Sequence, residues 1–310
     1  MSKNDQPKLS IIILNYNTQD ITIQAIESIE KNYPTEVREG VFEIIVTDNA
    51  SPDGSLETFS RYQKKTSIKL FHVIDNGANI GFSAGNNKGV FFAKGKYILF
   101  LNPDTITYAK TLNYMLDFMD HHPNAGAASC KLINKNGNVD FNCHRGFPTP
   151  WNSFCYFSGL QKLFPHNKIF AGYTQGWKNL NTTHEVDAIE GAFVLIPRKI
   201  GEEVGWWNED YFFNGEDLQL CFDIKKLGYK IYYVGEVSIM HIGGAASGVK
   251  TSGSAFTTAN TETKTKVQSW RFDAMRKFYK KNYANSYPFF INWLVLRGID
   301  YLYKKTLPRI

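Results

Sequence analysis

The chain has 310 residues, enough to bury one large core or two smaller ones. With 43% hydrophobic and 21% charged residues, its composition is typical of a globular protein and excludes a disordered chain. The net charge of +6 is uneven, because the segment from Lys264 onward carries eleven Lys and Arg against two acids, leaving −3 for residues 1–263. The body of the chain is therefore not expected to bind nucleic acid, whereas the tail could meet an anionic partner.

The cysteine pattern and the N-terminus argue against a secreted protein. The four cysteines form no Cys-x-x-Cys pair, so we expect neither a zinc site nor a disulfide framework. The first ten residues, MSKNDQPKLS, lack the apolar region of a signal peptide, and no run of about 18 apolar residues predicts a membrane-spanning helix. A cytoplasmic protein is the expectation.

The first hundred residues alternate between strand and helix patterns. Buried strands are predicted over 9–16, 41–48, 68–75 and 96–101. Helices are predicted over 20–32, after Gly54 and over 81–95, the last ending at Gly95. This alternation predicts an α/β fold with a mostly parallel sheet covered by helices. Ligands bind such sheets beyond the carboxyl ends of the strands.

The second half is less regular. Residues 130–185 read as loops with short elements, followed by a strand or strand pair over 186–198, a helix over 215–228 and strand patterns over 229–235 and 238–244. Residues 245–263 are small and polar and predict a mobile loop or lid. We divide the chain into residues 1–125, residues 126–250 and a C-terminal extension with the loop (251–310).

Three predicted strands end in polar residues at the edge where a ligand would bind: Asn15-Tyr16-Asn17, Asp48-Asn49 and Asn102-Pro103-Asp104. Neither GxxxxGK[ST] nor a GxGxxG after the first strand is present, so neither common phosphate loop applies. Taken alone, Asp104 could be a metal ligand or simply part of a polar turn.

Five stretches, in order over roughly residues 9–245, resemble family 2 glycosyltransferases, most closely a rhamnosyltransferase-like subgroup: LSIIILNYN, IIVTDNASPDGS, NIGFSAGNNKGVFFAKGKYILFLNPDT, IEGAFVLIPR and VGWWNEDYFFNGEDLQLCFDIKKLGYKIYYVGEVSIMHIGG. The resemblance implies a GT-A fold, with a Rossmann-like nucleotide-binding half and an acceptor-binding half. It also implies a nucleotide-sugar donor, a divalent cation and inversion of the anomeric centre.

The resemblance assigns a metal and a base. Asp104 matches the last Asp of the family's DxD-type motif and would hold Mg²⁺ or Mn²⁺, while Asn102 would contact the nucleotide. His241, after the last strand, either completes the metal site or is structural. Asp217 matches the general base. Its neighbour Glu216 should raise one carboxyl pKa while the helix N-terminus lowers it, and the sequence leaves the balance open.

The remaining site assignments also follow from the resemblance. Asp48 would read a pyrimidine base, which favours a UDP- or dTDP-sugar, and other residues would line the nucleotide: Asn15, Tyr16, Asn17, Gly81, Gly85 and Asn86. The donor-sugar and acceptor pocket would include Glu190, Gly191, Ala192 and Glu216, with Trp206 and Trp207 either stacking on a sugar or filling the core.

The sequence departs from the family pattern after Asp217, where Gln219 and Asp223 replace the usual Asp and Arg. Because of these two changes, a non-catalytic nucleotide-sugar-binding protein remains an alternative to an active glycosyltransferase. A sugar nucleotidyltransferase is a weaker one, because NYNTQDIT lacks the Gly-rich, basic stretch that such enzymes need after the first strand.

The tail, residues 286–305, mixes aromatic, aliphatic and basic residues. As a helix it would either lie in an anionic lipid interface at the inner face of the plasma membrane or pack on the core. The expected function is transfer of a sugar, rhamnose among the candidates, to a saccharide or lipid-linked saccharide in cell-surface polysaccharide synthesis.

Overall fold

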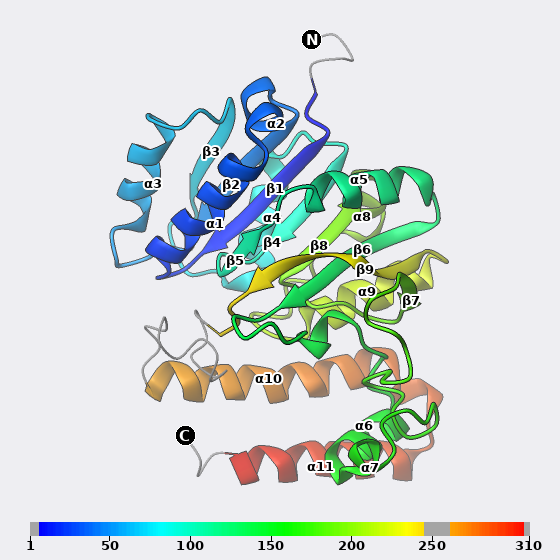
Figure 1. Cartoon of the computed structure of the whole chain (residues 1–310). Coiled ribbons are helices and arrows are strands. Elements are labelled where there is room, and N and C mark those ends of the chain that lie inside the picture. The colour runs from blue at the N-terminus through cyan, green and yellow to red at the C-terminus, as the bar shows by residue number, and fades with distance from the viewer. Residues whose placement is uncertain (1–5, 245–260, 307–310) are drawn as a thin grey trace.

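The structure is a computed structural model that describes residues 6–244 and 261–306. Its centre is a nine-stranded sheet of order β3-β2-β1-β4-β8-β6-β9-β5, with β7 paired to β9 beside this path (Figure 1). The strands are β1 (Leu9–Asn15), β2 (Phe42–Asp48), β3 (Leu70–Asp75), β4 (Tyr97–Leu101), β5 (Thr105–Thr107), β6 (Ala125–Ile133), β7 (His184–Val186), β8 (Phe193–Pro197) and β9 (Lys230–His241).

The parallel part of the sheet is the part that the strand–helix alternation predicted. β3, β2, β1 and β4 are parallel neighbours, and every residue of β2 and β4 is buried. Helices cover both faces of such a sheet. Because the side chains on both faces are then buried, the strand sequences are mostly apolar. β8 then runs antiparallel to both β4 and β6, while β6 and β9 are parallel.

Helices cover the sheet and extend beyond one end of it (Figure 1). They are α1 (Gln19–Asn32), α2 (Pro34–Glu39), α3 (Ser55–Gln63), α4 (Gly81–Phe92), α5 (Thr111–His121), α6 (Pro150–Ser158), α7 (Leu160–Leu163), α8 (Arg198–Val204), α9 (Glu216–Lys226), α10 (Thr261–Asn282) and α11 (Phe289–Thr306), with short 3₁₀ helices at Phe141–Cys143 and Ala284–Ser286. α10 lies below the edge at which β1, β6 and β9 end, and α6, α7 and α11 lie beyond α10.

Several predicted boundaries are wrong. α4 ends at Phe92 instead of Gly95, because the chain is already extended at Ala93. Gly95 packs on β1, where a Cβ atom would come within 2.5 Å of the Ser10 backbone nitrogen. The predicted strand or strand pair over 186–198 is two strands, because Val186 ends β7 and Phe193–Pro197 forms β8. The two last strand patterns form one strand, β9. Most of the predicted lid, 245–263, lies outside the described residues.

The sheet and its core run through the predicted boundary at residue 125. β6 begins there and joins the same sheet as β1 to β4, and one hydrophobic cluster extends from Leu9 to Ile239. The four cysteines are free and buried. Among the described residues, no helix is long and apolar enough to cross a membrane.

Candidate active site

The ends of β1 and β2 bring the first two predicted polar groups together. Asn15 and Asp48 are direct partners in the parallel register. The buried Asn15 amide donates to Asp48 Oδ1 at 2.6 Å and to Ser51 Oγ at 2.9 Å, while its oxygen accepts from the hydroxyls of Thr18 and Thr22. These four contacts use the whole hydrogen-bonding capacity of the amide. The Asn15 side chain therefore holds Asp48 in place, and its predicted position beside the nucleotide stays a prediction.

Asp48 is buried at this edge and is held by Ser51 as well. Its Oδ1 accepts from the Ser51 hydroxyl at 2.6 Å, and its Oδ2 accepts from the Ser51 backbone N–H at 2.9 Å. The Ser51 hydroxyl also accepts from the Asn17 backbone N–H, and Asn17 has a positive φ of 54°. The adjacent Tyr16 is exposed. The loop after β1 is thus fixed around Asp48 by Ser51.

The glycine-rich start of α4 has a packing reason that involves no ligand. A Cβ atom on Gly85 would lie 2.6 Å from Leu14 Cδ1, so the glycine lets α4 approach β1 closely. Gly81 has a φ of +87°, and a Cβ atom there would meet the Phe212 carbonyl oxygen at 2.7 Å. The buried Asn86 amide donates to the Phe82 carbonyl within the helix. The predicted nucleotide contacts of these three residues stay predictions.

β5 places Asp104 against His241. Asp104 immediately precedes β5, and Thr105 pairs with His241, the last residue of β9. His241 Nε2 lies 3.4 Å from Asp104 Oδ1, and both side chains are buried. Asn102, at the end of β4, donates its backbone N–H to the Ala192 carbonyl at 3.0 Å. The 102–104 turn therefore joins residues 190–192 to the end of β9.

Two more carboxylates lie on the other side of the His241 ring. His241 Nδ1 is 4.0 Å from Glu190 Oε2, and one ligand atom from each of His241, Glu190 and Asp140 lies within 4.8 Å of the others. Glu190 was predicted for the sugar pocket, and Asp140 was not predicted at all. Asp140 follows β6, where its side chain also accepts from the Asn142 backbone N–H.

Asp217 begins α9 and is paired with an arginine. Its Oδ2 accepts a hydrogen bond from Arg145 Nη2, and both side chains are largely buried. Arg145 reaches this position because its backbone pairs with Ala188, with N–H to O distances of 3.0 and 2.9 Å. Burial is the largest influence on the Arg145 guanidinium and lowers its pKa, but Asp217, Tyr173 and Glu190 together outweigh burial and raise the pKa.

Residues 190–192 connect Asp217 to the carboxylates around His241. A Cβ atom on Gly191 would lie 3.9 Å from the Asp217 Cβ atom, whereas Glu190, one residue earlier, lies beside His241. The strand-end turn, the histidine and Asp217 therefore belong to one site. Glu216, beside Asp217, is buried, and burial followed by the Asp217 charge raises the pKa of Glu216 to about 8.

The tryptophan pair belongs to the packing of the molecule. Trp207 is 1% exposed and makes edge contacts with the rings of Phe82 and Phe100, at centroid distances of 5.4 and 4.9 Å. The partly buried Trp206 covers Gly201, where a Cβ atom would come within 2.1 Å of its ring. The stacking role of Trp207 is corrected to a core role, and the contacts of Trp206 favour the same interpretation.

Gln219 and Asp223, the two residues that depart from the family pattern, are hydrogen-bonded to each other. Gln219, which is fully buried, donates from Nε2 to Asp223 Oδ2 at 2.9 Å. Its Oε1 accepts from the Tyr211 hydroxyl at 3.1 Å and from the Asn282 amide of α10 at 2.9 Å. The two changed residues therefore satisfy each other and tie α9 to α10.

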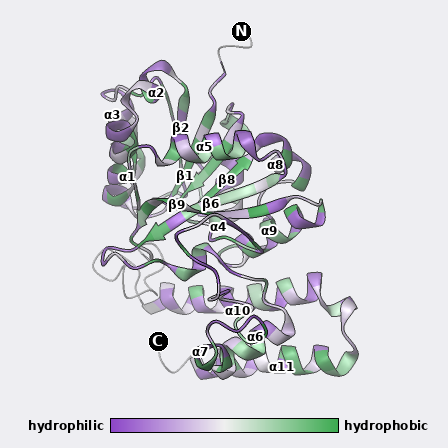
Figure 2. Cartoon of the chain, turned by 45° about the vertical axis from the view of Figure 1, so that its right-hand side comes forward, coloured by the Kyte–Doolittle hydropathy of each residue, from purple (hydrophilic) through white to green (hydrophobic). Residues whose placement is uncertain are grey.

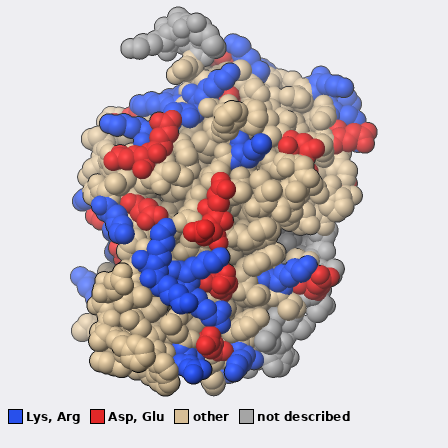
Figure 3. All heavy atoms as spheres, turned by 180° about the vertical axis from the view of Figure 1, so that it is seen from behind, with Lys and Arg blue, Asp and Glu red and all other residues tan. Residues whose placement is uncertain are grey.

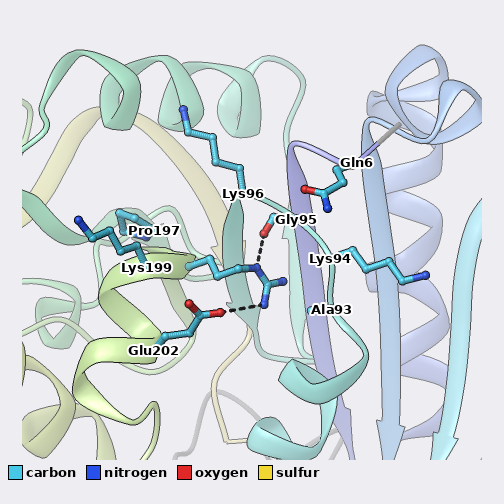
Figure 4. A pocket seen from close by; sticks show the side chains of 9 residues that line it. Gln6, Ala93, Lys94, Gly95, Lys96, Pro197, Lys199 and Glu202 are labelled. Atoms are coloured by element: carbon cyan, nitrogen blue, oxygen red, sulfur yellow. Dashed lines mark hydrogen bonds and ion pairs between the residues drawn. The ribbon is translucent and has the colours of Figure 1, made fainter. Parts of the chain in front are cut away.

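One pocket among the described residues lies away from this site. It has a volume of about 580 Å³ and is lined by Lys94, Lys96, Arg198, Lys199 and Glu202, among others (Figure 4). These residues precede β4 and follow β8, so the pocket is at the opposite end of β4 from Asn102. It shares no residue with the site above.

The chain is similar to known glycosyltransferases in sequence. A family model described as Glycosyl transferase family 2 matches residues 10–178. The low-salt glycan biosynthesis hexosyltransferase Agl10 of Haloferax volcanii is 26% identical over 75% of this chain and 66% of its own length. An uncharacterised glycosyltransferase of Methanocaldococcus jannaschii is 31% identical over 44% of this chain and 46% of its own. The chain thus spans about half to two thirds of these two relatives.

Solved structures show the same fold. The mannosyltransferase PcManGT of Pyrobaculum calidifontis, solved with GDP-Man and Mn²⁺, matches 90% of this chain and 64% of its own with a TM-score of 0.56 and 15% identity. GalNAc-T7, solved with UDP, GalNAc and Mn²⁺, matches 93% of this chain and 52% of its own with a TM-score of 0.59 and 16% identity. The predicted GT-A fold is confirmed. Because the family model covers more than half of the sequence, the chain belongs to glycosyl transferase family 2.

Proposed function

We propose that the protein is an inverting, metal-dependent glycosyltransferase. It transfers a sugar from a nucleoside diphosphate to a saccharide or lipid-linked saccharide during synthesis of a cell-surface polysaccharide. One observation carries this proposal: the segment 190–192 joins a buried acid at a helix start, Asp217, to a cluster of carboxylates around His241. The name of Agl10, a glycan biosynthesis hexosyltransferase, supports the choice of product class.

The donor atoms around His241 fit a divalent cation. Carboxylate oxygens suit Mg²⁺ and Mn²⁺, and an added imidazole favours Mn²⁺. Asp104 and His241 would hold the cation, and Asp140, Glu190 and His241 form a second set of ligand atoms that lie within 4.8 Å of one another. When bound, the cation would neutralise the charge that develops on the departing diphosphate.

Asp217 is the base in this proposal. Its carboxylate takes the proton from the acceptor hydroxyl as the oxygen attacks the anomeric carbon. Arg145 fixes the Asp217 carboxylate through Oδ2, and the Leu218 backbone N–H donates to Oδ1 at 2.7 Å. Gly191 leaves space beside Asp217 in which the two reactants can meet.

We propose a pyrimidine nucleotide donor, UDP- or dTDP-linked, with dTDP-rhamnose as the first sugar to test. The Asp48 carboxylate supports this choice. Among the described residues its Oδ2 accepts one hydrogen bond, which leaves room for a ring N–H of uracil or thymine. The exposed Tyr16 and the loop around Asn17 would border the ribose.

We place this activity in the cytoplasm, at the inner face of the plasma membrane, where a lipid-linked acceptor would be held. The non-catalytic rival loses support, because Gln219 and Asp223 satisfy each other without disturbing Asp217. The nucleotidyltransferase alternative remains weak, because the chain has no basic, Gly-rich loop after β1.

Thermal-shift measurements with a panel of nucleotide sugars, each with and without Mn²⁺, test the donor and the metal together. We expect stabilisation that requires both, and we expect it to disappear in the Asp104→Asn and His241→Ala variants. Stabilisation by every nucleotide sugar without metal would contradict metal dependence.

Asp217→Asn tests the base. This variant should keep the donor-induced shift but lose transfer by about a hundredfold or more, as expected when a general base is removed. Asp223→Asn, further along α9, is the matched control and should keep transfer. Full transfer by Asp217→Asn would show that another group accepts the proton.

A further inference from the structure

The exposed large hydrophobic side chains of the described residues are concentrated in two segments. Twelve of nineteen lie between residues 150 and 170 or between 289 and 301. In the first segment they are Trp151, Phe154, Tyr156, Phe157, Leu163, Phe164 and Ile169, and in the second Phe289, Phe290, Trp293, Leu294 and Tyr301. Scattered exposed apolar residues need no explanation, but a concentration of this size indicates an interaction surface.

Both segments lie at the same end of the molecule. α6 and α7 lie with α11 beyond α10, on the side away from the sheet, and this holds in two views 45° apart (Figures 1 and 2). We call the exposed residues of 150–170 and 289–306 the aromatic end. Because the parallel strands end toward α10, the aromatic end is on the same side of the sheet as the candidate active site.

α11 is fixed to α10 by one face only. Asp300 accepts from Arg276 of α10 at 2.7 Å, the Tyr279 hydroxyl of α10 donates to Asn292 at 2.5 Å, and Ile299 is buried. The exposed aromatic and aliphatic residues at 289, 290, 293, 294 and 301 lie mainly opposite Asn292 and Ile299, with Asp300 on the border between the two sides. The helix therefore packs on its neighbour and still presents an apolar face outward.

The exposed charges of the aromatic end are mostly positive. Lys162, Lys168, Arg297, Lys304 and Lys305 are exposed, and residues 150–170 contain no Asp or Glu. Asp300 is the only acid of residues 289–306; its side chain is 43% exposed and is paired with Arg276. Seen from behind, Lys and Arg side chains, with a few Asp and Glu side chains between them, lie beside an uncharged area in the lower part of the molecule (Figure 3).

We propose that the aromatic end docks the protein on an anionic lipid bilayer. Trp, Tyr and Phe side chains favour the interface between headgroups and acyl chains, and lysines around them are attracted to anionic headgroups. A protein partner would suit the aromatic side chains equally well, but the five exposed cations without a free acid match a uniformly anionic surface best. α6 and α7 thus join α11 in one membrane-binding surface.

Docking this end would bring the carboxyl edge of the sheet toward the lipid surface. This consequence rests on the proposed function, because it matters only if the acceptor is lipid-linked. The docking itself does not depend on the transfer chemistry, and its test uses no substrate.

Flotation with phosphatidylcholine vesicles, with and without about a third of phosphatidylglycerol, tests the surface. We expect binding to the anionic vesicles that weakens at high salt. Phe154→Ser/Leu163→Ser in α6 and α7, and Phe290→Ser/Trp293→Ser in α11, should each lower the partition coefficient at least about tenfold, since burial of one such side chain carries that much free energy.

Two control variants match these changes. Phe91 on α4 is 83% exposed, so Phe91→Ser removes an equally accessible ring from another surface and should leave binding unchanged. Lys304→Gln/Lys305→Gln should weaken binding to anionic vesicles, whereas Lys64→Gln/Lys65→Gln, a second pair of adjacent exposed lysines, should not. Unchanged thermal unfolding midpoints confirm that every variant folds.

Three results would overturn the proposal: no flotation of the intact chain, flotation of both aromatic variants at the level of the control, or self-association through this surface in place of vesicle binding. Transfer to a short saccharide acceptor, measured separately, reports on the proposed function alone. A variant that keeps this transfer but no longer floats would support the docking surface independently of the chemistry.

Discussion

The pairing of Arg145 with Asp217 leads to a prediction that unfolding experiments can test without a substrate. Arg145→Met removes the guanidinium but keeps an unbranched apolar side chain in its place. The wild-type guanidinium is largely buried, contacting the Asp217 carboxylate, the Ile189 carbonyl at 3.4 Å and the Tyr173 hydroxyl at 3.5 Å. The substitution therefore leaves the Asp217 carboxylate without its cation in a site that excludes most water.

The size of the effect follows from burial. Removal of one partner from a buried ion pair costs about 3–5 kcal/mol of unfolding free energy. The Asp217 side chain is 13% exposed, so some solvation remains and we expect about 3 kcal/mol. Asp217→Asn should cost a similar amount, because it leaves Arg145 as the unpaired charge. The double variant should lose much less unfolding free energy than the sum of the two single variants, since it leaves neither charge unpaired.

Urea unfolding of the wild type, both single variants and the double variant gives the coupling free energy directly. Arg198→Met is the control, because Arg198 lies 3.7 Å from Glu202, whose side chain is 58% exposed, and that pair should contribute less than about 1 kcal/mol. Additive costs for Arg145→Met and Asp217→Asn would refute the reasoning, since they would mean that the two side chains stabilise the fold independently.

Three further predictions concern single positions. Glu216→Gln should flatten the pH dependence of the unfolding free energy. Because the pKa of Glu216 is raised in the folded state, the unfolded carboxyl releases its proton first as pH rises from about 5 to 8. The wild type should therefore lose up to roughly 1.4 kcal/mol of unfolding free energy per pH unit over this range. Thermal unfolding at several pH values checks this. Gly95→Ala should destabilise by about 1–3 kcal/mol through contact with the Ser10 backbone, whereas Gly298→Ala, on an open helix surface, should stabilise by about 0.5–1 kcal/mol, as measured by urea unfolding. Gln219→Ala should lower the unfolding free energy by about 1–3 kcal/mol, because the partly buried Asp223 side chain and the Tyr211 hydroxyl lose their partner. An unchanged urea midpoint would contradict this.

The sequence predicted the parallel half of the sheet because its signals are local. β1, β2 and β4 are buried, largely apolar runs, and β1, β2 and β3 are each followed by a helix. The paired ends of β1 and β2 then followed from the rule that parallel strands finish at one edge. The end of α4 was missed because Gly95 is a glycine for a contact with β1, a reason that no local pattern contains.

The site residues that the sequence did not reveal come from irregular segments. Asp140 and Arg145 lie in a stretch without periodicity, and they reach the site only through long-range pairings, of β6 with β9 and of Arg145 with Ala188. Their residue types carry no motif, since one Asp and one Arg among loops are usually surface residues. The burial of the Arg145 guanidinium beside Asp217 is what distinguishes it, and burial is a property of the fold.

The structure also resolves the question that the Glu216-Asp217 pair left open. Two opposing effects act on neighbouring carboxyls at the start of α9, a like charge and the helix N-terminus. Burial decides between them for Glu216, whose pKa is raised to about 8, so this side chain is mainly protonated at neutral pH. Asp217 instead faces the Arg145 guanidinium and Gly191. A protonated carboxyl cannot accept a proton, so the raised pKa of Glu216 argues against Glu216 as the base and supports the proposal that Asp217 fills this role.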